Sequence, residues 1–119
     1  MSLLTAVAVD CIVPRNTYKT LRFQILDYDT GNAYDLTGHE VILSMDSSRA
    51  GDGELVKYGS IFNASGGSVQ FEFEPDDTKD LLARAYVADI LVRDTTSELY
   101  WPGWSGSIAV VPFLKGVEE

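Results

Sequence analysis

The chain has 119 residues, enough for one domain with a core that needs no crosslinks, and 45% of them are hydrophobic, as in globular rather than disordered proteins. Its formal net charge of −9, with nine scattered basic residues, opposes non-specific binding to nucleic acid and to anionic membranes. Cys11 is the single cysteine, so no internal disulfide can form, and we expect a buried, inert thiol.

The N-terminal segment resembles a secretion signal only weakly. It lacks a basic start, and Asp10 interrupts its apolar run, so we expect a strand over residues 5–13 instead. No apolar stretch approaches the roughly 20 residues of a membrane span. These features predict a chain that is made in a cytoplasm and does not enter a membrane.

Alternation of apolar and polar residues, the pattern of a strand with one buried face, recurs along the rest of the chain. It is cleanest near Ser68, where we expect Val69, Phe71 and Phe73 to face the core. The predicted strands after the first cover residues 18–28, 39–46, 55–62, 68–74, 86–94 and 98–111. A Pro-Gly pair at 102–103 interrupts the last one, which predicts an edge, bulge or kink at that point.

Residues 75–84 break the alternation. Pro75 is followed by two aspartates, which suit the positive end of a helix dipole, and then by apolar residues. We therefore expect one short helical turn near residues 76–84. Seven or eight short strands with one such turn predict an all-β antiparallel sandwich, formed as a single domain over residues 1–119 with its core over about residues 5–111.

Several short motifs, in order, resemble the immunoglobulin-like N-terminal domain of phage baseplate upper proteins and related phage tail and fibre domains. They lie at residues 23–25, 27–32, 36–38, 41–45, 69–73, 75–80 and 85–90. The resemblance covers about residues 18–111 and implies an immunoglobulin-like sandwich that assembles into a virion. The chain departs from that pattern in Ala85, where a glycine is usual, and in the aromatic run at 100–106. It also ends where longer members continue, which suggests a stand-alone virion component.

Candidate catalytic and metal-binding residues are few. The acidic turn at 27–32 lacks the glycine and the distant glutamate of a calcium loop, so we expect an ordinary β-turn. His39 and Cys11 do not make a zinc site, and His39 is expected to be exposed or hydrogen-bonded. Glu72 and Glu74 share a strand face, which any solvated strand produces. We therefore expect no catalytic residue, no metal and no cofactor.

The strongest candidate binding feature is aromatic. Tyr100, Trp101 and Trp104 could anchor a protein interface, stack on sugar rings, or pack in the sandwich core. Phe113 and Leu114 continue the apolar character beyond the last strand, where a neighbouring subunit could cover them. We expect the segments at 1–4 and 112–119 to contact neighbours, with folding back onto the sandwich as the alternative.

The composition and the absence of a catalytic pattern predict a structural, non-enzymatic protein, and the resemblance implies a phage virion component of the tail, baseplate or fibre-attachment region. Its partners would be other virion proteins and copies of itself, with no nucleic acid and no membrane. It would be made in the host cytoplasm and reside in the virion. The alternatives are a small carbohydrate-binding or adhesive module that uses the aromatic residues, and a capsid decoration protein.

Overall fold

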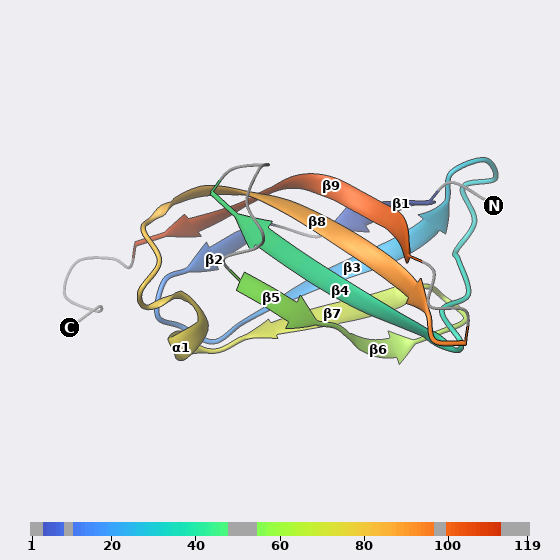
Figure 1. The fold of residues 1–119 in the computed structure, drawn as a ribbon, viewed down its shortest axis with the longest axis horizontal. Coiled ribbons are helices and arrows are strands. Elements are labelled where there is room, and N and C mark those ends of the chain that lie inside the picture. The colour runs from blue at the N-terminus through green and yellow to red at the C-terminus, as the bar shows by residue number, and fades with distance from the viewer. Residues whose placement is uncertain (1–3, 9–10, 48–54, 97–99, 113–119) are drawn as a thin grey trace.

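The computed structural model describes residues 4–8, 11–47, 55–96 and 100–112. Within these ranges, nine strands form two sheets that pack face to face, with one short helix at an end of the molecule (Figure 1). The prediction of an all-β sandwich with one helical turn is confirmed. The strand count exceeds the expected seven or eight because two of the predicted strands each divide between the sheets.

The order of strands in each sheet is that of an immunoglobulin-like sandwich. The four-stranded sheet has the order β1 (Leu4–Ala8), β3 (Lys19–Asp27), β7 (Ser68–Phe73) and β6 (Ser60–Asn63). The five-stranded sheet has the order β2 (Ile12–Pro14), β9 (Tyr100–Val111), β8 (Arg84–Asp94), β4 (His39–Asp46) and β5 (Leu55–Tyr58). These orders match strands A-B-E-D and G-F-C-C′ of immunoglobulin domains, with β2 added beside β9.

The first predicted strand is in fact two strands in different sheets. β1 pairs antiparallel with β3, whereas β2 pairs parallel with β9 in the other sheet. The prediction of one continuous strand over residues 5–13 is wrong because a single polar residue, Asp10, within an apolar run is no local signal for a change of sheet. Tertiary pairing decides it, since both sheets offer a free edge on this side of the sandwich.

The predicted strand at 55–62 also divides, at Gly59. β5 pairs with β4, and β6 pairs with β7. The backbone of Gly59 passes directly over the core, where a Cβ would lie 2.5 Å from Cγ2 of Val69 and 3.0 Å from the Phe71 ring. Only glycine fits this close crossing between the sheets.

The core lies between the two sheets and follows the predicted alternation. Val69, Phe71 and Phe73 are fully buried, and Phe71 packs edge-on against Phe23 with ring centroids 5.8 Å apart. The predicted register of the strand at 68–74 is therefore confirmed. The other buried members of this cluster are Val13, Leu21, Ile25, Leu36, Val41, Leu43, Met45, Tyr86, Ala88, Ile90, Val92, Ile108 and Val110.

The helix is shorter than predicted and begins one residue earlier. α1 covers Pro75–Thr78, and the Glu74 backbone N–H donates to Oδ2 of Asp77 at 2.7 Å. The same carboxylate pairs with Lys57 Nζ at 2.9 Å, which ties the helix to β5. The chain then turns towards β8, so the expected helical character up to residue 84 is wrong.

The end of this turn carries a second immunoglobulin-like feature. Tyr86, buried near the start of β8, donates its hydroxyl to the Leu82 carbonyl at 2.7 Å. A tyrosine near the start of strand F that bonds back to the upstream backbone is the tyrosine corner of immunoglobulin-like domains. This contact was not predicted from the sequence, and it fixes the crossover between the sheets.

Candidate interaction surface

A β-bulge in β9 decides where the aromatic residues point. Ile90 pairs with Trp104 and Leu91 pairs with Pro102, so Gly103 is the extra residue. The bulge confirms the irregularity predicted at the Pro-Gly pair. It also places Trp101 and Trp104 on the same face of β9, the face towards the core, although their odd spacing in a regular strand would put them on opposite faces.

Trp104 belongs largely to the core. Its ring lies 5.2 Å from that of Phe23, and it packs against the central cluster. Gly106 makes the space, because a Cβ there would lie 2.5 Å from Cζ2 of the indole. One side of Trp104 remains open to a hollow of about 400 Å³ between the edges of β1 and β9, lined also by Leu4 and Ala6.

Trp101 is half-buried at the end of the sandwich, with its ring 6.1 Å from that of His39. His39 in turn packs edge-on against Tyr34, and its Nδ1 lies 2.9 Å from the Thr37 carbonyl. The prediction of a hydrogen-bonded His39 is confirmed. Tyr34, His39 and Trp101 therefore form one cluster of aromatic rings at this end of the sandwich.

Tyr100 is the member of the aromatic trio that lies on the outer face. It is 52% exposed, and the Arg93 guanidinium lies 5.9 Å from the centre of its ring. Arg93 also bonds Oε1 of Glu40 from Nη1 at 3.0 Å. The ring of Tyr100 is therefore exposed to solvent on one side and contacts, on the other, an arginine that the ion pair with Glu40 fixes in place.

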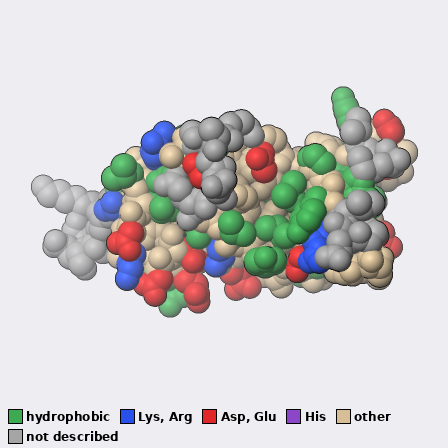
Figure 2. Space-filling model, viewed as in Figure 1, with side chains coloured by type: hydrophobic (Ala, Val, Ile, Leu, Met, Phe, Trp, Pro, Cys, Tyr) green, Lys and Arg blue, Asp and Glu red, His purple; other side chains and the backbone are tan. Residues whose placement is uncertain are grey.

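An apolar row crosses the outer face of the five-stranded sheet next to this ion pair. Tyr58, Ile42, Leu91 and Pro102 are consecutive cross-strand neighbours on β5, β4, β8 and β9. We call these four residues the apolar band. Figure 2 shows hydrophobic side chains gathered over the middle of this face. Tyr58 is 65% exposed, whereas Ile42 in the centre is only 9% exposed because its neighbours cover it.

The apolar band was not predicted, although the sequence carries a signal for it. Residues 41–43 and 90–92 are each three consecutive apolar residues, Val-Ile-Leu and Ile-Leu-Val. A strand that is apolar on both faces is typical of a sheet covered on both sides. Here the inner faces form the core, so the middle residues of the two runs give the outer face its apolar centre.

The predicted β-turn at 27–32 is confirmed. Oδ1 of Asp27 accepts hydrogen bonds from the backbone N–H groups of Asp29 and Thr30, and Gly31 has a φ of 73°. These bonds occupy the carboxylate within its own turn. Among the described residues, no group of three or more His, Cys, Asp or Glu side chains is arranged to hold a metal ion.

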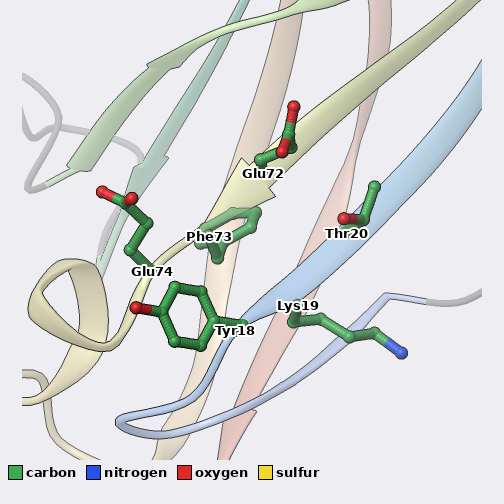
Figure 3. Close-up of a pocket in the computed structure, with 6 residues that line it drawn as sticks. All are labelled: Tyr18, Lys19, Thr20, Glu72, Phe73 and Glu74. Atoms are coloured by element: carbon green, nitrogen blue, oxygen red, sulfur yellow. The ribbon is translucent and has the colours of Figure 1, made fainter.

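Glu72 and Glu74 border a shallow hollow of about 300 Å³ together with Tyr18 and Lys19. Figure 3 shows the Lys19 side chain pointing away from both glutamates, and the two carboxylates pointing in different directions rather than converging. The solvated-face interpretation of this pair fits the exposure of both side chains. Cys11, predicted to be buried, is half-buried against the core cluster.

Two of the predicted interface residues, Phe113 and Leu114, lie outside the described residues, as do residues 1–3 and 113–119 of the terminal segments. Their predicted contacts with neighbouring subunits stay predictions. In the part of the chain that the structure describes, no helix has the length and apolar character that crossing a bilayer requires.

No protein-family model and no curated protein matches this chain. Among the solved structures similar to it is the crystal structure of the Lin-41 filamin domain, with 14% sequence identity and a TM-score of 0.48. The alignment covers 88% of this chain and 90% of that chain. The immunoglobulin-like fold is assigned from the strand order and the tyrosine corner described above.

Proposed function

We propose that this chain is a non-enzymatic structural module that functions by protein–protein assembly in a phage virion, with the apolar band as its main contact surface. The observation that carries the proposal is the row of four apolar side chains across the outer face of the five-stranded sheet. Exposed apolar surface bordered by polar residues is typical of protein interaction sites.

The surroundings of the band support a protein partner. The Glu40–Arg93 ion pair and the exposed ring of Tyr100 border it on one side. Interfaces are enriched in tyrosine and arginine around an apolar centre. The sequence resemblance to phage baseplate and tail domains favours a virion as the assembly, in the tail, baseplate or fibre-attachment region.

The experiment is incorporation into particles. Phage particles assembled with wild-type chain or with a Leu91→Lys variant are purified by density gradient, and the chain is quantified by mass spectrometry. We expect wild-type chain in the particles and loss of the variant, which places a charge in the apolar band. A matched Gln24→Lys variant on the exposed outer face of the four-stranded sheet should be incorporated normally. Wild-type chain found only in the soluble fraction would contradict the proposal.

A carbohydrate-binding or adhesive module is the second candidate. The exposed ring of Tyr100 favours it, because a tyrosine held by Arg93 could stack on a sugar. A glycan array probed with wild-type chain and with Tyr100→Ala tests this candidate. Glycan binding lost in the variant would favour it over the assembly function.

A further inference from the structure

We propose that the outer face of the five-stranded sheet binds a second copy of this chain, in a pair whose two-fold axis runs along the strands between β4 and β8. The inference rests on the proposed function, since it names the partner of the apolar band. A two-fold pair requires a surface that complements itself, so that each side chain meets a suitable group after the rotation.

Three rows of side chains on β4 and β8 meet that requirement. The outward residues of β4, in order, are Glu40, Ile42, Ser44 and Asp46, and their cross-strand partners on β8 are Arg93, Leu91, Asp89 and Val87. The first three rows are complementary, and Asp46 at the end of β4 would lie over Val87. The proposed axis lays β4 of one copy over β8 of the other. An acidic group then faces a basic one, an aliphatic side chain faces another, and a hydroxyl faces a carboxylate.

The ion pair at the border of the band has the geometry to be shared. Glu40 and Arg93 are 3.0 Å apart within one copy, with side chains 34% and 26% exposed. In the pair, two glutamates and two arginines would alternate, so each guanidinium lies between two carboxylates. Arginine has five donors and can bond both. Because each pair is already neutralised internally, covering it is less costly than covering a lone charge.

The apolar band supplies the centre of the contact. The same axis lays Ile42 over Leu91 of the second copy, and Tyr58 over its Pro102. The axis overlays four strands, β5, β4, β8 and β9, whereas β2 lies outside the contact. Four strands about 4.8 Å apart and about eight residues long give a face of roughly 500 Å² in outline. Side-chain relief adds accessible area to this outline and brings it towards the roughly 800 Å² per partner of a standard interface.

Charge favours this face for self-association. The chain has a net charge of −9, so two copies repel each other in most orientations. On this face Arg93 meets a carboxylate of the second copy, and Asp89, which accepts a hydrogen bond from Ser105 at 2.7 Å, meets Ser44. No like charges on these three rows are brought into register.

Two of the open strand edges are less suited to pairing with another copy. Where β2 no longer covers it, β9 carries Pro102, which has no N–H to donate, and the adjacent bulge at Gly103. β6, at an edge of the other sheet, is also irregular, between Ile61 and Asn63. Proline and bulges on edge strands are devices that prevent edge-to-edge association. A face-to-face pair leaves these edges as they are.

Sedimentation velocity over a dilution series tests the pair. We expect wild-type chain to dimerise, and Leu91→Lys, Arg93→Glu and Glu40→Arg each to weaken the dimer by at least about 30-fold. The Arg93→Glu chain then carries two acidic groups at the site and the Glu40→Arg chain two basic ones. We expect these two chains, each monomeric alone, to associate when mixed. Circular dichroism checks that each variant is folded.

Arg22→Glu, on the exposed outer face of the other sheet, is the matched control and should leave the dimer unchanged. The inference is overturned if wild-type chain is monomeric up to about 1 mM, or if the mixed variants do not associate. A monomeric wild type whose Leu91→Lys variant is still excluded from particles would overturn only the self-pairing and leave the proposed function standing. A wild-type chain that dimerises but is absent from particles would overturn the proposed function and leave the self-pairing standing.

Discussion

Phe71→Ala tests the register on which the whole sandwich depends. Phe71 is 0% exposed at the centre of β7 and packs edge-on against Phe23. Truncating a fully buried phenylalanine costs about 3–5 kcal/mol, through lost burial and the cavity left behind. Its ring pair with Phe23 favours the upper half of that range.

The loss converts directly into a melting temperature. The entropy of unfolding is about 2.1 cal/mol/K per residue, or about 250 cal/mol/K for this chain, so a loss of about 4 kcal/mol lowers Tm by about 16 °C. Urea denaturation followed by tryptophan fluorescence gives the free energy, and calorimetry gives the Tm. Should the variant fail to fold at all, Phe71→Leu leaves a smaller cavity and should give a smaller, measurable loss.

The matched control is Phe62→Ala, the same substitution on neighbouring β6. Phe62 is 53% exposed, with the Arg22 guanidinium over its ring at 5.5 Å. A surface truncation of this kind costs about 0.5 kcal/mol or less. If Phe71→Ala cost under about 1 kcal/mol, or no more than the control, Phe71 would not be core and the register would be wrong by one residue.

Three further outcomes are expected. Tyr86→Phe removes the hydroxyl of the tyrosine corner and leaves the Leu82 carbonyl without its donor. We expect the free energy of unfolding, measured by urea denaturation, to fall by about 1 kcal/mol. An unchanged free energy would mean that this hydrogen bond does not stabilise the fold. Gly106→Val places atoms where the Trp104 indole lies. We expect it to lower the free energy of unfolding by about 1–3 kcal/mol and to shift the tryptophan emission to the red. Unchanged emission would mean that the indole does not pack against Gly106. The pKa of Asp35 is lowered from 3.8, mainly by the hydrogen bond from the Thr37 hydroxyl and secondly by the bond from the Thr37 backbone N–H. The ionised carboxylate therefore stabilises the folded state at pH values above its unfolded pKa, and this stability is lost as the pH falls through the folded pKa. Thr37→Val should raise that pKa in an NMR titration, and an unchanged pKa would show that the hydroxyl is not its cause.

Much of the fold could be predicted from the sequence because its determinants are local. Alternation with period two in residues 68–73 specifies both a strand and its buried face, and burial follows it residue by residue. The acidic turn at 27–32 was predictable for the same reason, since Asp27 bonds the backbone two and three residues ahead.

The candidate site was predictable only in part. Tyr100 was expected among the binding residues and does lie on the outer face, but Trp104, two residues beyond Pro102, turns inward. One inserted residue at Gly103 changes the face of everything after it, and its presence depends on pairing with β8. The apolar runs at 41–43 and 90–92 indicate strands that are apolar on both faces. Neither run, however, predicts that these two strands are neighbours in the sheet.

The fold class, the core register and the turns therefore follow from local sequence pattern, because a residue's burial in a strand depends on its own position and on that of its near neighbours. The division of residues 5–13 and 55–62 between the sheets, the crossing at Gly59 and the assembly of the apolar band depend on the three-dimensional structure. Each of these depends on which distant strand offers a partner. That choice is made by long-range backbone pairing and packing, for which a short segment carries no periodic signal.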